Sequence, residues 1–313
     1  MARVPDFETL VAGGKPAMAA ALAAIERDAG APAVVELLDR AWAAPKAHAI
    51  GLTGPPGVGK STLTGALIRA WRSEGRTVGI IAVDPSSKRT GGALLGDRTR
   101  LATDPEDQGI FVRSMAARDR LGGLASLTFA AMVLMRAVYD VVLVETVGVG
   151  QSETDVVTVA DTVVFCIQPG SGDSLQFMKA GIMEVPHVIV VTKADMGQAA
   201  IRARADVKGA LSLAGTGDGW DVPVLLVSAS TGAGMDRLAE VLAARRAWLG
   251  EGGRLERARR LQDRHWLRET LRDRFGREGL SGIGAEIDRD RAGSPFLREA
   301  ALAAGLSARL HGG

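Results

Sequence analysis

The sequence predicts an α/β, doubly wound domain with a mostly parallel sheet. Between about residues 47 and 230, short apolar runs alternate with segments of helix length. The runs are apolar at successive positions, which is typical of parallel strands covered on both faces by helices. Strands are therefore expected at 47–53, 78–83, 110–113, 141–145, 162–167, 188–192 and 224–227.

Helices are expected before this domain. From Phe7 to about Ala44 the apolar residues recur near a 3.6-residue period, which indicates amphipathic helices. Gly13-Gly14 and Gly30-Ala31-Pro32 interrupt the pattern. We predict two helices in this segment.

Helices are also expected after the last strand. One helix is predicted from Met235 to about Trp248, a strongly charged one at 254–275 and a short one at 295–310. The charged helix carries only a thin apolar stripe. It either packs on another molecule or lies on its own domain.

Composition limits the function classes. The 313 residues correspond to roughly two units, which we expect to be one large domain with extensions. A formal net charge of +2 does not favour nucleic-acid binding, and 47% hydrophobic residues are enough for a core. Cys166 is the single cysteine, so no intramolecular disulfide can form, and a reducing cytoplasm is expected. The start of the chain lacks a signal-peptide pattern, and no run of 18 apolar residues predicts a membrane span.

The strongest motif is a glycine-rich loop between a predicted strand and a predicted helix at 62–71. It reads Gly54-Pro55-Pro56-Gly57-Val58-Gly59-Lys60-Ser61-Thr62 and matches G-x-x-x-x-G-K-[ST]. Such a loop turns backbone N–H groups toward phosphates beside a helix N-terminus. Gly57 to Thr62 are expected to bind phosphate, with Lys60 at the β- and γ-phosphates and Ser61 on Mg²⁺.

A second motif follows the strand at 141–145. Glu145 ends this strand, where nucleotide-hydrolysing proteins with such a loop place a magnesium carboxylate. Gly148 could donate its N–H to a γ-phosphate oxygen. Because Glu replaces the commoner Asp, we expect a contact with Mg²⁺ through water rather than direct ligation.

A third motif predicts the base. Thr192-Lys193-Ala194-Asp195 follows a strand and is a variant of the guanine-reading N-K-x-D pattern, with Thr192 in the Asn position. The Asp195 carboxylate can accept from N1–H and N2–H of guanine, while the Lys193 stem covers the base plane. Ser228-Ala229 matches the loop that backs the guanine. The sequence therefore favours GTP over ATP.

Further polar residues lie on the loops between these motifs. Asp84 ends a strand, and Asp97 lies on a glycine-rich segment; both are candidate magnesium-shell or water-positioning carboxylates, or else ordinary turn residues. The segment from Gln168 to Asp173 precedes a helix with Lys179, which could sense the nucleotide or a partner.

The four histidines, His48, His187, His265 and His311, include no pair at a metal-ligand spacing. This argues against a nickel-storing protein.

Taken in order, these motifs resemble the MeaB/ArgK/MMAA family of P-loop GTPases. The resemblance rests on 54–62, 83–87, 90–98, 145–153, 168–173 and 192–195, and covers nearly the whole chain. It implies a GTPase chaperone that gates adenosylcobalamin loading and protects an acyl-CoA mutase, usually methylmalonyl-CoA mutase. It also implies a homodimer joined through C-terminal helices.

The resemblance assigns domains and roles. It implies an N-terminal helical extension at 1–45, a P-loop GTPase domain at 46–249 and a helical dimerisation arm at 250–313. Its catalytic set is Lys60, Asp97, Glu145 and Gly148, and its magnesium and switch network is Ser61, Asp84, Asp97 and Glu145. Lys179 falls on a switch loop that responds to the partner.

Two other functions remain open. One is a kinase of a small molecule or of an amino-acid transport component, the older label in this family; it would need an acceptor pocket. The other is a metal-delivery GTPase, which predicts Cys and His ligands. No arginine is committed by a motif to the transition state, which favours slow hydrolysis that a partner accelerates.

Overall fold

The computed structural model describes residues 4–85, 103–117, 126–146, 155–170, 186–212, 219–289 and 293–311. The chain forms two compact units: residues 1–47, 125–140 and 256–313 make the first, and residues 48–124 and 141–255 the second. These units are defined by contacts, whereas the predicted divisions after residues 45 and 249 follow chain order. Those divisions stay a prediction.

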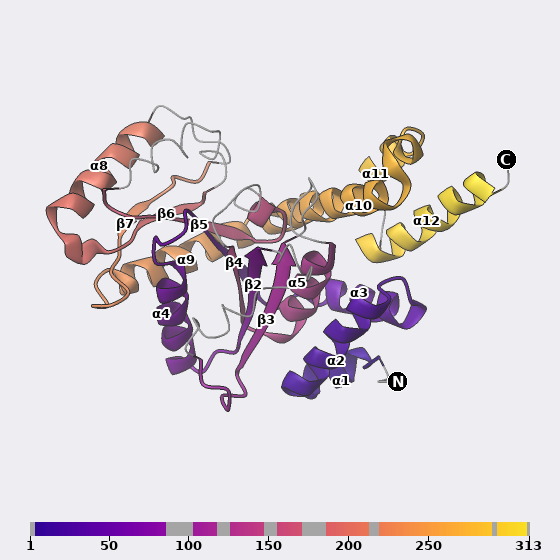
Figure 1. Ribbon diagram of the computed structural model, residues 1–313, viewed down its shortest axis with the longest axis horizontal. Coiled ribbons are helices and arrows are strands. Elements are labelled where there is room, and N and C mark those ends of the chain that lie inside the picture. Colours follow the sequence, from indigo (N-terminus) through magenta and orange to yellow (C-terminus); the bar gives the residue numbers. More distant parts are fainter. Residues whose placement is uncertain are drawn as a thin grey trace. The chain divides into compact units, whose positions relative to one another are not determined.

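The second unit is built on a seven-stranded sheet in the order β3-β2-β4-β1-β5-β6-β7. Every pairing in it is parallel. The seven predicted strands and the α/β, doubly wound fold are confirmed (Figure 1). The strands are β1 (His48–Thr53), β2 (Val78–Pro85), β3 (Ile110–Ala117), β4 (Val141–Thr146), β5 (Thr162–Ile167), β6 (Val188–Val191) and β7 (Val224–Leu226).

Helices cover both faces of this sheet. On one face, α4 (Lys60–Ser73) and α9 (Met235–Gly250) share a core with β1, β4 and β5. On the other face, α8 (Gln198–Leu211) packs beside β6 and β7, as Figure 1 shows. Each fully buried aliphatic side chain contributes about 1.5–3 kcal/mol through burial of apolar area, so these layers hold the sheet together.

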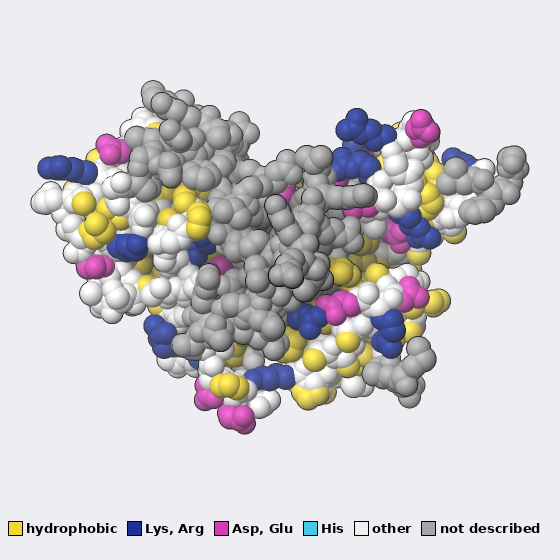
Figure 2. Space-filling model, in the orientation of Figure 1, with side chains coloured by type: hydrophobic (Ala, Val, Ile, Leu, Met, Phe, Trp, Pro, Cys, Tyr) yellow, Lys and Arg dark blue, Asp and Glu magenta, His cyan; other side chains and the backbone are white. Residues whose placement is uncertain are grey.

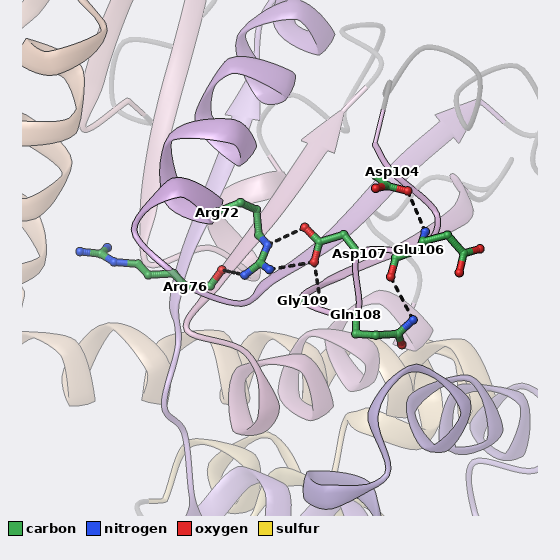
Figure 3. A network of polar contacts seen from close by, with 7 residues as sticks. All are labelled: Arg72, Arg76, Asp104, Glu106, Asp107, Gln108 and Gly109. Atoms are coloured by element: carbon green, nitrogen blue, oxygen red, sulfur yellow. Dashed lines mark hydrogen bonds and ion pairs between the residues drawn. The ribbon is translucent and has the colours of Figure 1, made fainter.

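A polar network anchors the C-terminal end of α4 (Figure 3). The Arg72 guanidinium donates from Nε and Nη2 to the two carboxylate oxygens of Asp107, at 2.8 and 2.7 Å. This bidentate hydrogen bonding raises the pKa of Arg72. A Cβ at Gly109 would lie 2.3 Å from Cζ of Arg72, so a larger residue there would have to displace the guanidinium from its present position. The network thereby fixes the helix whose other end begins at the phosphate loop.

The first unit is helical in its described residues. Three helices, rather than the two predicted, precede the sheet, because Gly14 adopts φ +59° and separates the first two. The helices are α1 (Phe7–Ala12), α2 (Gly14–Arg27), α3 (Pro32–Ala43), α5 (Ser126–Val138), α10 (Arg254–Leu280, which begins in the second unit), α11 (Gly284–Asp288) and α12 (Pro295–His311).

The C-terminal helices have their own small core. Leu267 and Leu271 of α10 pack with Ile283 and Ile287 around α11 and with side chains of α12. Gly276 has non-helical dihedrals and interrupts α10 directly after the predicted end at residue 275. The sequence did not predict α11. Figure 2 shows cationic and anionic side chains intermingled over α10 and α11, in keeping with the small net charge.

Buried polar contacts attach α10 to other helices of the first unit. Trp42 Nε1 of α3 donates to Asp263 at 3.0 Å, and Arg136 of α5 donates to Gln262 at 2.9 Å. The Trp266 ring packs against Phe129 of α5 with centroids 5.3 Å apart. The charged helix thus packs on its own chain, one of the two alternatives left open. Dimerisation through residues 250–313 stays a prediction.

Among the described residues, no helix is both long and apolar enough to cross a bilayer.

Asp263 gives a pH-dependent prediction. Burial raises its pKa to about 6, against the opposing effects of the Trp42 hydrogen bond and nearby arginines. Between about pH 4 and pH 6 the folded chain therefore keeps this proton, whereas the unfolded chain has lost it. The protonated carboxyl contributes fully to the free energy of unfolding below about pH 4, and this contribution is lost as the pH rises through about 6.

Substituting Asp263→Asn removes this dependence while keeping an acceptor for Trp42. We expect the free energy of unfolding of the Asp263→Asn variant, relative to that of wild type, to rise by about 2 kcal/mol between pH 4 and pH 7.5. Urea unfolding across this range measures it, with the exposed Asp273→Asn on the same helix as the control. Parallel wild-type and Asp263→Asn curves would contradict the prediction.

Candidate functional site

The site lies at the carboxyl ends of the central strands. The parallel register pairs Leu52 of β1 with Glu145 of β4, and Thr53 of β1 with Phe165 of β5. Thr146 Oγ1 also donates to Thr53 Oγ1 at 3.1 Å. The glycine-rich loop after β1 and the carboxylate at the end of β4 therefore meet at one edge, where open parallel sheets bind ligands.

The loop requires glycine at its first position. Gly54 has φ +133°, and a Cβ there would lie 2.1 Å from the carbonyl oxygen of Cys166 in β5. Gly59, with φ +95°, caps the N-terminus of α4, which begins at Lys60, two residues before the predicted start. The N–H groups of the first helical turn therefore lie at the end of the loop, as anion binding requires.

Lys60 is held inside this loop. Its Nζ donates to the carbonyl oxygens of Gly54 and Pro55 at 2.7 and 2.9 Å, and only 6% of the residue is exposed. The ammonium group thus lies within the turn that would surround phosphate. Cys166 behind the loop is inert, because burial raises the pKa of its thiol to about 12.

Ser61 and Glu145 form the candidate magnesium site. Ser61 Oγ donates to Glu145 Oε1 at 2.5 Å, and Thr64 Oγ1 donates to Oε2 of the same carboxylate at 2.9 Å. A hydroxyl and a carboxylate are hard oxygen donors that suit Mg²⁺, an ion that binds few protein groups and keeps several waters. These residues fit the ion. Whether Glu145 ligates it directly or through water stays a prediction.

The predicted guanine-reading residues come together beside the loop. Ser228 Oγ donates to Asp195 Oδ1 at 2.6 Å, and it lies 3.0 Å from Ser230 Oγ. The Ser228 bond is the main reason that the pKa of Asp195 lies below its ordinary value, so the carboxylate is ionised at neutral pH. Ala229 lies between these hydroxyls and is half-buried. An ionised, exposed carboxylate can accept both guanine N–H groups.

Thr192 and Lys193 bind this loop to the phosphate loop. Thr192 Oγ1 lies 2.6 Å from the Val58 carbonyl oxygen, and Lys193 Nζ donates to the Gly57 carbonyl at 3.2 Å. Lys193 Nζ also donates to Gln168 Oε1 at 2.5 Å. Lys193 adopts a left-handed φ of +52°, a conformation that non-glycine residues rarely take. The Thr in the Asn position thus provides a hydroxyl contact to the loop.

Four predicted site residues cannot be compared at the level of side chains. Asp84 lies in β2, which β4 separates from β1, and its side chain is outside the described residues, as are Asp97, Gly148 and Lys179.

Thr64 is a residue of this site that the motifs do not include. Its signal was available, because a residue three positions after Ser61 lies on the same face of a helix.

Comparisons with known proteins give the family of the chain. Residues 18–281 match the family described as methylmalonyl Co-A mutase-associated GTPase MeaB. The chain belongs to the MeaB family. GTPase ArgK of Escherichia coli is 39% identical over 259 residues, covering 81% of this chain and 76% of that one. The mouse mitochondrial methylmalonic aciduria type A homolog is 35% identical over 234 residues, 73% of this chain and 56% of that one.

A solved structure extends the likeness. The crystal structure of a protein described as LAO/AO transport system kinase superposes with a TM-score of 0.65 at 28% identity, covering 94% of this chain and 95% of that one. Together, the family match and the named relatives establish the P-loop GTPase fold and family. The predicted resemblance is confirmed.

The approach of Gly54 to β5 gives a second prediction. Gly54→Ala combines a left-handed conformation, which costs about 1–2 kcal/mol, with a backbone clash that adds about 1–3 kcal/mol. We expect a lower melting temperature and at least about tenfold weaker GDP binding, since a loss of about 1.4 kcal/mol is a tenfold loss in affinity.

Gly252→Ala is the matched control. Gly252 also has positive φ, but a Cβ there meets nothing within 4 Å. Thermal melting and nucleotide titration of both variants separate strain from clash. Equal stability of the two variants would contradict the assignment of Gly54 to a close backbone contact.

Proposed function

We propose that the protein binds and hydrolyses GTP with Mg²⁺ and acts as a chaperone that gates adenosylcobalamin loading of an acyl-CoA mutase, most simply methylmalonyl-CoA mutase. The observation that carries the proposal is the joining of a phosphate loop to a guanine-reading carboxylate by Thr192 and Lys193. Membership of the MeaB family, whose description names a mutase-associated GTPase, supports the choice of partner.

The residues of the site act by position and charge. Lys60 and the first N–H groups of α4 hold the phosphates, while Asp195 and Lys193 select and cover the guanine. Mg²⁺, when bound, neutralises phosphate charge in the transition state. Ser61 and Glu145 supply the oxygen donors that would hold it. In the proposal, Asp84, Asp97 and Gly148 complete the network around the γ-phosphate.

The proposal is regulatory. With no arginine assigned to the transition state, intrinsic hydrolysis is slow and the mutase accelerates it. Lys179 would lie on the segment that responds to the partner, residues 250–313 would form a homodimer contact, and the cytoplasm would be the place of action.

A kinase function has one observation in its favour, the likeness to the solved structure described as LAO/AO transport system kinase. It predicts transfer of the γ-phosphoryl group to an acceptor rather than to water.

Base selection gives the third prediction. Asp195→Asn replaces one acceptor oxygen by an N–H donor, which repels guanine N2–H but complements the C2 carbonyl of xanthine. We expect GDP affinity to fall about 100-fold and xanthosine diphosphate affinity to rise by a similar factor, because the amide N–H opposes a donor of guanine and meets an acceptor of xanthine.

Fluorescent-nucleotide titration of wild type, Asp195→Asn and the exposed control Asp221→Asn measures both affinities. If Asp195→Asn binds GDP as tightly as wild type does, Asp195 does not read the base and the guanine assignment fails.

The partner gives the fourth prediction. The protein is incubated with lysate of its own organism and GDP or a non-hydrolysable GTP analogue, and hydrolysis is then measured with and without the purified mutase. We expect nucleotide-dependent recovery of an adenosylcobalamin-dependent acyl-CoA mutase and at least about tenfold faster hydrolysis, because a partner that completes transition-state stabilisation contributes more than about 1.4 kcal/mol. Equal rates with and without the mutase would refute the regulatory proposal, and phosphorylation of a transport component would replace it with the kinase.

A further inference from the structure

We propose that Thr64 is a positioning residue that holds the carboxylate of Glu145 against Ser61 and thereby sets the affinity of the nucleotide site for Mg²⁺. The inference rests on the proposed function, since it concerns the same site. Thr64 lies outside the glycine-rich motif, which ends at Thr62.

The geometry is a two-point attachment. Ser61 and Thr64 lie one turn apart near the start of α4, and their hydroxyls donate to different oxygens of one carboxylate, Ser61 to Oε1 and Thr64 to Oε2. Thr64 has 0% exposure, so water cannot replace its hydroxyl. Glu145 lies on β4, whose pairing with β1 fixes its backbone in register. The carboxylate plane is therefore held from both sides.

The two attachments have different consequences when the ion is present. Ser61 is a ligand candidate, so its hydroxyl would hold the ion in place of its bond to Oε1. Thr64 is not a ligand candidate and would keep its bond to Oε2. That bond would leave Oε1 available to hold the ion or one of its waters.

The choice of glutamate makes this restraint necessary. A glutamate side chain has one more rotatable bond than aspartate, so an untethered carboxylate at Glu145 would sample more orientations at the end of β4. Fixing those orientations before the ion arrives lowers the entropy lost on binding. The buried Thr64 hydroxyl fixes the carboxylate in this way. The Glu145 side chain is long enough to reach that hydroxyl from β4.

Thr64→Val tests the inference, because valine has the shape of threonine and lacks the hydroxyl. The measurement is the affinity for fluorescent GDP at Mg²⁺ concentrations from zero, in EDTA, to several millimolar. We expect the Mg²⁺ concentration at half effect to rise about 3- to 10-fold, the net effect of losing one hydrogen bond, with unchanged affinity in EDTA. Thr64→Ser, which keeps the hydroxyl, should restore the wild-type titration.

Thr128→Val is the matched control. Thr128 is also a helical threonine with 0% exposure, but it lies in α5 of the first unit and its hydroxyl has no hydrogen-bond partner among the described residues. This variant should leave the Mg²⁺ titration unchanged. A general effect of removing buried hydroxyls would instead move both valine variants, and would overturn the inference.

The outcomes separate this inference from the proposed function. If wild type binds GDP with Mg²⁺ dependence and Thr64→Val has the same titration, the positioning role fails and the function stands. Equal weakening of Thr64→Val in EDTA and in Mg²⁺ indicates a structural role only, and also overturns it. If wild type binds no guanine nucleotide at any Mg²⁺ concentration, the function fails and the inference with it.

Discussion

The parallel pairing of β1 with β4 on one side and β5 on the other is the constraint on which the site depends. Their register places Leu52 opposite Glu145 and Thr53 opposite Phe165. The loop after β1 therefore turns against the backbone of β5, where only Gly54 fits, and toward the carboxylate of β4. A shift of one residue in either pairing would move the carboxylate or close the loop, since successive side chains point to opposite faces.

The phosphate and guanine ends of the site share one loop. The carbonyl groups of Gly57 and Val58 contact Lys193 and Thr192, while the following residues begin α4. In the proposed function, the phosphates and the guanine therefore both depend on the backbone of Gly57 and Val58, so binding of one would help to position the residues that bind the other. Ionised Asp195 adds selectivity, because its Ser228 bond is made before any base arrives.

Short sequence patterns predicted the elements that depend on neighbouring residues, and they did not predict contacts between distant parts of the chain. Apolar runs gave all seven strands of the described sheet, and the order of motifs gave the family. The N-terminal helix count was wrong because the glycines at 13 and 14 mark an interruption in the pattern but do not show whether the helix ends there, as it does with Gly14 at φ +59°. Asp263 lies in the helix that the sequence describes as strongly charged, so its burial was not predicted. Its partner Trp42 is 221 positions away in the chain, and no local pattern connects the two. Helix spacing alone places Thr64 on the face of Ser61, but its contact with Glu145 required knowing which strand end faces α4.

The chain connection between the units bears on the proposed regulatory role. Only Tyr139 and Asp140 separate the end of α5, in the first unit, from the start of β4, the strand that ends in Glu145. Within the first unit, Arg136 of α5 donates to Gln262 of the C-terminal helix α10. A partner that displaced α10 would disturb a buried charged hydrogen bond, whose loss is costly, on the helix that leads directly into β4. The candidate magnesium carboxylate, Glu145, thus lies in the strand that directly follows a helix in contact with α10.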